Sequence, residues 1–292
     1  IVSAYFEIPS KHSSLEYGDW SSNFLSLDES MVIFTSRAHV ASILERRERL
    51  LQKTYVVELE LQRLGKVVNE SLDHAFWQSQ FDMDPERLLH KSYQLFWIWH
   101  SKPWLVAQAI KQNPFDSDLF IWSDYGSFRN SRYNNRAWVT DESVIPYSKM
   151  LVMSFIETPA DPTSELVIKQ NHFSTGEFFF SGAQMAGYSN TWLQYWEDYK
   201  VVVNRYIQQG LFIGDDQPLL QSTCMSRPMS CTYALPKGLS GDAFFGLQEV
   251  LHGELESVQF WQHETVVSGK NGHGMPCRTP IITHSRYAIF TM

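Results

Sequence analysis

The fold is best constrained by one stretch of this sequence, Asp118-Leu119-Phe120-Ile121-Trp122-Ser123-Asp124-Tyr125-Gly126. Its four consecutive large apolar residues, 119–122, predict a strand that is buried on both faces of a largely parallel sheet. A carboxylate, Asp124, follows where this strand should end. Because ligands of open α/β sheets bind beyond the carboxyl ends of the strands, Asp124 is placed to hold a hard cation or a polar substrate.

Similar apolar runs on both sides of this stretch predict further strands. We expect them at residues 1–8, 31–34, 55–59, 149–156 and 177–182. After the second run, Thr35-Ser36 is expected to cap an amphipathic helix. The apolar face of that helix would carry Val40, Ile43, Leu44 and Leu51, and the charged run 45–49 would be solvated. This βαβ rhythm favours an α/β fold with a mostly parallel, mixed central sheet flanked by helices.

The remaining segments are mainly helical or irregular. Residues 71–84 are expected to form a surface loop or short helices, and residues 128–141 a loop over the strand ends. Residues 86–112 have a helical pattern that is interrupted at Ser101-Lys102-Pro103, where Ser101 would cap a second helix. The clearest helix is 189–209, which Gly210 ends. We interpret the apolar stripe of this helix as part of the core and not as a ligand-binding site. The stripe consists of Trp192, Tyr195, Trp196, Tyr199, Val202, Val203 and Tyr206.

The composition excludes several classes of protein. With 292 residues, 43% of them apolar, the chain is long enough for a large globular core. The 24 basic and 32 acidic residues give a net charge of −8, which argues against a nucleic-acid surface. No run of apolar residues is long enough to span a membrane. Since the chain begins with Ile1, we expect a Golgi or secretory-pathway lumen if an anchor was trimmed, and otherwise the cytoplasm.

Three cysteines define neither a disulfide framework nor a paired metal motif. Two interpretations stay open at this point. The thiols are buried and free, or Cys224 and Cys231 close a small loop around Arg227-Pro228, which would require an oxidising compartment.

A second acidic turn follows the clearest helix, at Gly214-Asp215-Asp216. Adjacent carboxylates repel one another unless a cation, a donor or solvent compensates, so this pair is a candidate general base. The alternative is a solvated helix N-terminus, which carboxylates favour. For Asp124 the alternative is a turn former. The basic candidates for contact with a diphosphate are Lys102, Arg129 and Lys270, although each alone is also typical of an ordinary surface charge.

An ordered set of motifs resembles the HtrL/YibB family, which is associated with bacterial surface-polysaccharide loci and is similar in layout to GT-A glycosyltransferases. The set covers most of the chain from Ile1 to about Pro228. It consists of Val2-Ser3-Ala4-Tyr5-Phe6, Trp122-Ser123-Asp124-Tyr125-Gly126-Ser127-Phe128-Arg129, Ser181-Gly182 and Gly214-Asp215-Asp216-Gln217. The resemblance implies a single GT-A-like domain over 1–292, with a nucleotide-sugar-binding half at 1–130 and an acceptor half at 131–292.

The resemblance also implies roles for residues. Asp124 would be the carboxylate for Mn²⁺ or Mg²⁺ and the diphosphate, although Gly126 replaces the second acid of the usual Asp-x-Asp motif. His273 would be a late metal ligand. Asp215 and Asp216 would face the acceptor, where one of them would deprotonate the attacking hydroxyl in an inverting mechanism. The nucleotide pocket would comprise Ser3, Tyr5, Thr35, Arg37, Ser123, Tyr125, Gly126 and Gly182, together with Lys102 and Arg129.

The expected function is therefore transfer of a sugar from a nucleotide-sugar donor to a saccharide or glycoprotein acceptor. Two other functions remain open. A carbohydrate-binding or scaffold protein of the same fold would have lost the chemistry, as the missing second acid suggests. A nucleotidyltransferase would share the sheet and the metal, but it would release pyrophosphate instead of a nucleoside diphosphate.

Overall fold

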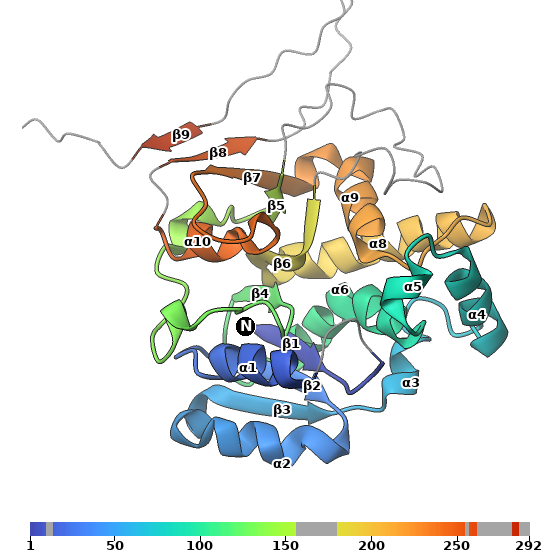
Figure 1. Ribbon diagram of the computed structural model, residues 1–292. Coiled ribbons are helices and arrows are strands. Elements are labelled where there is room, and N and C mark those ends of the chain that lie inside the picture. Colours follow the sequence, from blue (N-terminus) through green and yellow to red (C-terminus); the bar gives the residue numbers. More distant parts are fainter. Residues whose placement is uncertain (10–13, 156–179, 255–256, 262–281, 286–292) are drawn as a thin grey trace, which may run out of the picture.

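The computed structural model describes residues 1–9, 14–155, 180–254, 257–261 and 282–285 (Figure 1). The strands are β1 Val2–Tyr5, β2 Met31–Thr35, β3 Thr54–Glu58, β4 Leu119–Ser123, β5 Met150–Ser154, β6 Phe180–Tyr188, β7 Cys231–Lys237, β8 Ser257–Trp261 and β9 Ile282–Ser285. The α-helices are α1 Ser14–Leu25, α2 Arg37–Arg46, α3 Leu61–Leu64, α4 His74–Met83, α5 Arg87–His90, α6 Gln94–Gln112, α8 Ser189–Gln208, α9 Asp216–Ser226 and α10 Leu247–Leu251. Short 3₁₀ segments are η1 Glu48–Lys53, η2 Ser131–Tyr133, η3 Glu142–Val144, η4 Pro228–Ser230 and η5 Ala243–Phe245.

The strands form one nine-stranded sheet in the order β3-β2-β1-β4-β6-β5-β7-β8-β9. Strands β3, β2, β1 and β4 are parallel to one another, and β5 is parallel to β7. Strand β6 is antiparallel to both of its neighbours, and β8 and β9 add antiparallel pairs at the edge. The α/β class and the mixed central sheet are therefore confirmed, with β6 between the two parallel parts.

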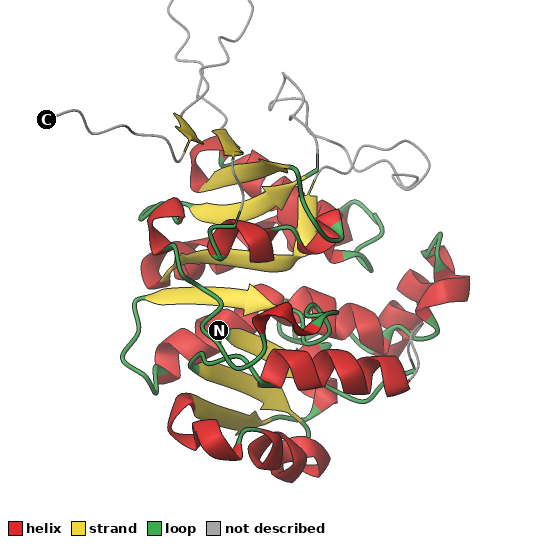
Figure 2. Ribbon diagram, turned by 60° about the vertical axis from the view of Figure 1, so that its left-hand side comes forward, coloured by secondary structure: helices red, strands yellow, loops and turns green. Residues whose placement is uncertain are grey.

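Helices cover both faces of this sheet (Figure 2). Successive strand residues alternate between two cores: Val32 and Phe34 face one, and Met31 and Ile33 face the other. Helices α6, α8 and α9 build the first core, while α1, α2 and α10 contribute to the second. The predicted stripe of α8 is confirmed as core, since all seven of its residues are buried. The two cores hold the sheet edge rigid where the chain turns out of the strands.

Helix α6 differs from the prediction because it passes unbroken through Pro103. Ser101 caps no second helix; its hydroxyl donates to the Trp97 carbonyl one turn earlier at 2.6 Å. Proline removes one backbone donor, but Ser101, Lys102 and Pro103 are all buried where α6 packs on β1 and β4. This tertiary packing outweighs the local signal and places Lys102 in the middle of a helix.

The predicted helix after Ser36 is also corrected. Helix α2 ends at Arg46, a 3₁₀ segment follows, and Leu51 is 51% exposed instead of facing the core. Arg47, expected on a solvated face, is buried. Its guanidinium donates to the carbonyls of Leu25, Leu27 and Glu29, at 2.9, 3.1 and 2.7 Å. These carbonyls satisfy its donors, which explains how a charge in a charged run lies inside the protein.

Other predicted segments have different bounds in the structure. Residues 74–83 form helix α4, which the Asp73 carboxylate caps by accepting from the Phe76 amide at 2.8 Å. Strand β6 extends to Tyr188 rather than ending at Gly182, because β4 and β5 pair with it on both sides. Part of the strand predicted at 177–182 and all of 262–281 lie outside the described residues. Among the described residues, no helix is long and apolar enough to cross a membrane.

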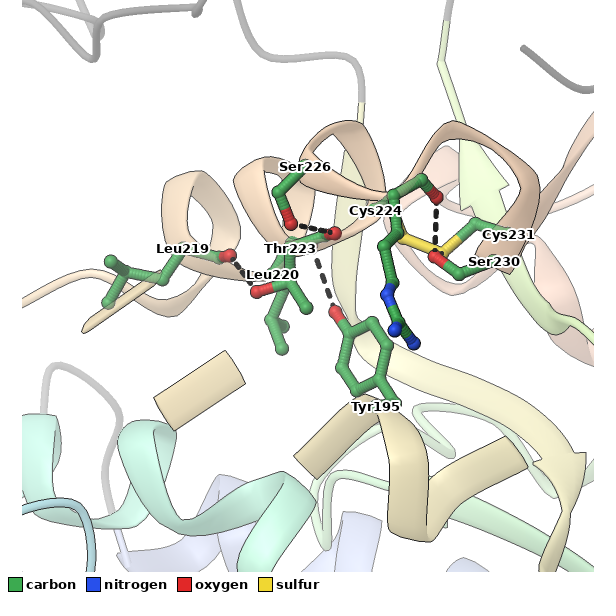
Figure 3. Close-up of a disulfide and its surroundings, with 9 residues drawn as sticks. Tyr195, Leu219, Leu220, Thr223, Cys224, Ser226, Ser230 and Cys231 are labelled. Carbon is green, nitrogen blue, oxygen red and sulfur yellow. Dashed lines mark hydrogen bonds between the residues drawn. A yellow bond between two sulfur atoms is a disulfide. The ribbon is translucent and has the colours of Figure 1, made fainter. Parts of the chain in front are cut away.

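A disulfide joins Cys224 at the end of α9 to Cys231 at the start of β7, with 5.5 Å between their Cα atoms (Figure 3). Of the two open interpretations of these cysteines, the bonded one is confirmed; Cys277 lies outside the described residues. On the neighbouring turn of α9, the Tyr195 hydroxyl of α8 donates to the Leu220 carbonyl at 2.9 Å. The bridge and this bond fix α9 between the sheet and α8, and α9 begins with the acidic pair.

Candidate active site

A cavity of about 750 Å³ opens at the carboxyl ends of β1 and β4. These two strands are parallel neighbours, with Val2 opposite Trp122, so the residues that follow them meet at one edge. Nine residues that were singled out from the sequence line the cavity: Tyr5, Lys102, Asp124, Tyr125, Gly126, Arg129, Gly182, Asp215 and Asp216. They come from segments more than 200 positions apart in the chain.

The centre of the site is the ammonium of Lys102. Its Nζ lies 2.9 Å from Asp124 Oδ1 and 2.6 Å from Asp216 Oδ2. It also donates to the Gly182 carbonyl at 2.9 Å. An ammonium has three hydrogens, and here three acceptors from three separate elements surround it. We call Lys102, Asp124, Gly182 and Asp216 the lysine cluster.

Local structure brings the acidic residues of the cluster to this point. The Asp124 amide donates to the Ala183 carbonyl of β6 at 2.9 Å, which fixes the turn after β4. Asp216 is the first residue of α9, and Asp215 is the N-cap whose Oδ1 accepts from the Gln217 amide at 3.1 Å. A Cβ on Gly182 would lie 2.8 Å from Asp216 Oδ2, so only glycine leaves room for that carboxylate.

Burial and charge set the protonation of these groups. Burial opposes the charged form of Lys102, but the carboxylates of Asp124 and Asp216 raise its pKa above the ordinary value. Burial also raises the pKa of Asp124, and the Lys102 ammonium acts in the opposite direction. For Asp215, burial and then the charge of Asp216 raise the pKa well above the ordinary value. Both effects favour the protonated form of Asp215.

A second cation, Arg129, lines the cavity without a carboxylate partner in the described part of the chain. Its guanidinium lies 4.4 Å from the ring centre of Trp20 and 4.6 Å from that of Phe245. Cation–π contacts fix the plane of the guanidinium while its N–H groups stay available. This arrangement suits an anionic group of a ligand.

Aromatic rings line the cavity near the end of β1. Tyr5 stacks on Tyr125 with ring centres 4.8 Å apart, and His39 meets Tyr5 edge-on at 4.8 Å. Burial raises the pKa of both tyrosines, so their hydroxyls stay protonated. Flat rings beside a cavity provide stacking surfaces for a planar ligand.

Four predicted pocket residues lie elsewhere. Ser3 Oγ donates to the Ser123 carbonyl at 2.7 Å, and Thr35 Oγ1 donates to the Tyr5 carbonyl at 2.7 Å. Both hydroxyls tie neighbouring strands together, and Ser123 Oγ itself contacts Ser127 Oγ at 2.8 Å. Arg37 is exposed in the first turn of α2. None of these four side chains lines the cavity, while His273 and Lys270 lie outside the described residues.

Sequence reasoning missed a buried pair at the cavity, His90 and Asp84. The imidazole Nδ1 lies 2.7 Å from Asp84 Oδ2, and Nε2 lies 3.3 Å from Glu86 Oε2. His90 and Glu86 both line the cavity, as does Trp99, whose ring centre is 5.1 Å from that of His90. The only sequence signal is the i, i+4 spacing of Glu86 and His90, which is common in helices without a site.

The described residues do not fit a divalent cation held at Asp124. Asp124 Oδ1 already accepts from Trp122 Nε1 at 2.8 Å and lies 2.9 Å from Lys102 Nζ. Its Oδ2 accepts from the same ammonium at 3.2 Å. Within the described ranges, no three His, Cys, Asp or Glu side chains gather as a metal site would need. The Lys102 ammonium therefore contacts the Asp124 oxygens that, by the resemblance to the Asp-x-Asp motif, were expected to bind a metal ion.

Comparison with known proteins identifies a family and a similar solved structure. The family model described as "Bacterial protein of unknown function (HtrL_YibB)" matches residues 1–246. The comparison with curated proteins finds no match. Among solved structures, the chain is similar to the "crystal structure of mouse Xyloside xylosyltransferase 1, apo form". The identity is 11% and the TM-score 0.39, over 78% of this chain and 81% of that one. A match at this TM-score assigns neither a substrate nor an activity.

Proposed function

The chain belongs to the HtrL/YibB family, and we propose that it is a glycosyltransferase that moves a sugar from a nucleotide-sugar donor to a saccharide or glycoprotein acceptor. One observation carries this function. A cavity of about 750 Å³ at the ends of parallel strands combines the lysine cluster with Arg129, a guanidinium without a carboxylate partner in the described part of the chain. A volume of this size suits a ligand of several hundred daltons.

The donor nucleotide would use the side of the cavity near β1. Arg129 would donate to the diphosphate, whose charge grows as the sugar leaves. The rings of Tyr5 and Tyr125 would provide a stacking surface for the base. Each of these groups is held in place by protein contacts before any ligand arrives, which lowers the cost of ordering them on binding.

The acceptor would meet the acidic residues at the start of α9. Either Asp215 or Asp216 would take the proton of the attacking acceptor hydroxyl as the sugar is transferred. Asp216, paired with Lys102 at 2.6 Å, would be the carboxylate that orients the attacking hydroxyl. Asp124, the other carboxylate in contact with Lys102, would face the donor sugar.

The test is turnover of a panel of nucleotide sugars, followed by release of the nucleoside diphosphate with and without saccharide acceptors. We expect Asp124→Asn to lower turnover at least about 100-fold, since it removes a charge from the reacting centre. The matched control is Asp118→Asn, an exposed carboxylate at the other end of the same strand, which should keep wild-type turnover.

Three results would contradict the proposal. Equal turnover of the folded Asp124→Asn and wild-type proteins would remove the carboxylate from the mechanism. Release of pyrophosphate in place of a nucleoside diphosphate would identify a nucleotidyltransferase. Saccharide binding without turnover of any nucleotide sugar would favour a carbohydrate-binding protein.

A further inference from the structure

Lys102 is 2% exposed, which is unusual for a lysine. Burying an ammonium is costly unless charges and hydrogen bonds compensate. Its three acceptors come from the turn after β4, from β6 and from the first turn of α9. The chain thus brings three separate elements together around one buried positive charge, at the wall of the cavity and not in the middle of the core.

Without Lys102, the carboxylates of Asp124 and Asp216 would lie close together with no cation between them. Oxygens of Asp124 and Asp216 both lie within 3 Å of one nitrogen, so without a cation the two groups would repel strongly. Paired carboxylates of this kind are what a divalent cation bridges in many sites. Here the bridging cation is covalently part of the chain.

From this geometry we infer that Lys102 replaces the divalent cation of the site, so that a nucleoside diphosphate binds in the cavity without Mn²⁺ or Mg²⁺. The choice of ligand class rests on the proposed function, but the replacement itself concerns only residues of this chain. The negative charge of the diphosphate is met by Arg129, whose guanidinium has no carboxylate partner among the described residues. Lys102 donates to Asp124 Oδ2 and to the Gly182 carbonyl, and its ammonium lies 2.6 Å from Asp216 Oδ2, so its charge neutralises the carboxylates that would repel the ligand.

Gly182 supports this interpretation independently of charge. Its carbonyl accepts from Lys102, and a Cβ at this position would lie 2.8 Å from Asp216 Oδ2. Glycine therefore leaves room for the carboxylate that pairs with the ammonium. An ammonium needs only three acceptors, whereas Mg²⁺ requires near-octahedral oxygen ligands.

The first experiment titrates Mn²⁺ alone into the wild-type protein and into Asp124→Asn, by calorimetry after dialysis against a chelator. We expect no Mn²⁺ binding that depends on Asp124. Binding to the wild type that is lost in Asp124→Asn would overturn the inference. Binding that persists unchanged in the variant would support it, because that metal would then bind away from Asp124.

The second experiment uses Lys102→Met, which shortens the unbranched side chain by one atom and removes its charge. The two carboxylates are then free to share a metal, so Mn²⁺ should raise the melting temperature of this variant and not that of the wild type. Lys111→Met, an exposed position on the same helix, is the control and should behave as the wild type. If the folded Lys102→Met protein gains no stabilisation from Mn²⁺, the inference is wrong.

A third measurement needs no variant and separates this inference from the proposed function. Uridine and guanosine diphosphates are titrated into the wild-type protein with a chelator and then with Mn²⁺. Equal affinity for the nucleotide in the two conditions supports the replacement of the metal ion by Lys102. Nucleotide binding that is at least tenfold tighter with Mn²⁺ overturns it. Absence of nucleotide binding in both conditions contradicts the proposed function, and the two Mn²⁺ titrations then decide the replacement by themselves.

Discussion

Two buried cations of the described chain, Arg47 and Lys102, have opposite surroundings. The guanidinium of Arg47 donates to four main-chain carbonyls and to Thr54 Oγ1, which lies 2.7 Å from its Nε. Lys102 is held by two carboxylates and one carbonyl. Burial lowers the pKa of Arg47 to about 10, whereas the carboxylates raise that of Lys102.

The two cations also differ in whether their partners lie at the cavity. Three of the carbonyls that accept from Arg47 lie between the end of α1 and the start of β2, so this charge fixes the path of the chain, and Arg47 does not line the cavity. The partners of Lys102 are titratable groups that line a cavity. A buried charge that is balanced by acids at a cavity wall is a stronger indication of a site than burial alone.

The largest expected effect separates the two cations directly. Arg47→Met leaves several buried carbonyls without a donor, so it should lower the free energy of unfolding by roughly 3 to 5 kcal/mol. Its turnover per folded molecule should stay within about twofold of the wild type, since Arg47 does not touch the cavity. Lys102→Met should lower turnover at least about 100-fold in the folded fraction. Denaturant unfolding and turnover on the same preparations provide both values.

Arg49→Met, at a neighbouring exposed arginine, is the control for Arg47 and should change neither quantity. The comparison fails if Arg47→Met loses turnover as severely as Lys102→Met while still folded. It also fails if Lys102→Met affects stability alone.

A smaller effect concerns a third buried base, His100, two residues before Lys102 on α6. Its Nε2 donates to the Ile213 carbonyl, and its Nδ1 accepts from the Tyr199 hydroxyl at 3.1 Å. Burial lowers its pKa to about 4, although the Ile213 carbonyl and Asp216 act in the opposite direction. The contrast with Lys102 shows what direct contact with carboxylates adds, because burial without it favours the neutral form of the His100 imidazole.

This pKa predicts how stability depends on pH. An unfolded histidine titrates near 6.5, so the unfolded chain binds this proton first as the pH falls. Stability should therefore be lost between pH 6.5 and about 4, by up to roughly 3 kcal/mol from this residue. Unfolding curves of the wild type and of His100→Gln across this range measure the contribution as the difference between their slopes. Parallel curves would show that His100 is not buried in its neutral form.

Much of the fold follows from local sequence. Strands β1, β2, β4 and β5 are short apolar runs, as buried strands require, and α8 carries a long apolar stripe with helical period. The predictions were wrong where tertiary packing, and not local sequence, determines the structure. Pro103 marks a break in the sequence, yet α6 continues because its neighbours are buried. Arg47 looks solvated in a charged run, and only the distant carbonyls of Leu25 and Leu27 explain its burial.

The members of the site were easier to predict than their contacts. Asp124, Asp215 and Asp216 follow from carboxylates at turns beside predicted sheet elements, and Gly182 from the resemblance. Lys102 pairs with Asp124 and Asp216 because of how α6 packs beside β4 and α9. No local sequence pattern predicts this packing. His90 and Asp84 were missed for the same reason. The glycosyltransferase activity, the metal and the roles of individual residues stay predictions.

The most direct test of the central claim, that this cavity binds the nucleotide of a sugar donor, is calorimetric titration of nucleoside diphosphates into the wild type and into Arg129→Gln. Glutamine keeps polar contacts but removes the charge that faces the cavity between Trp20 and Phe245. We predict saturable binding to the wild type and at least about tenfold weaker binding to Arg129→Gln, which corresponds to about 1.4 kcal/mol. Equal affinities for the two proteins, or no binding to the wild type, would contradict the claim.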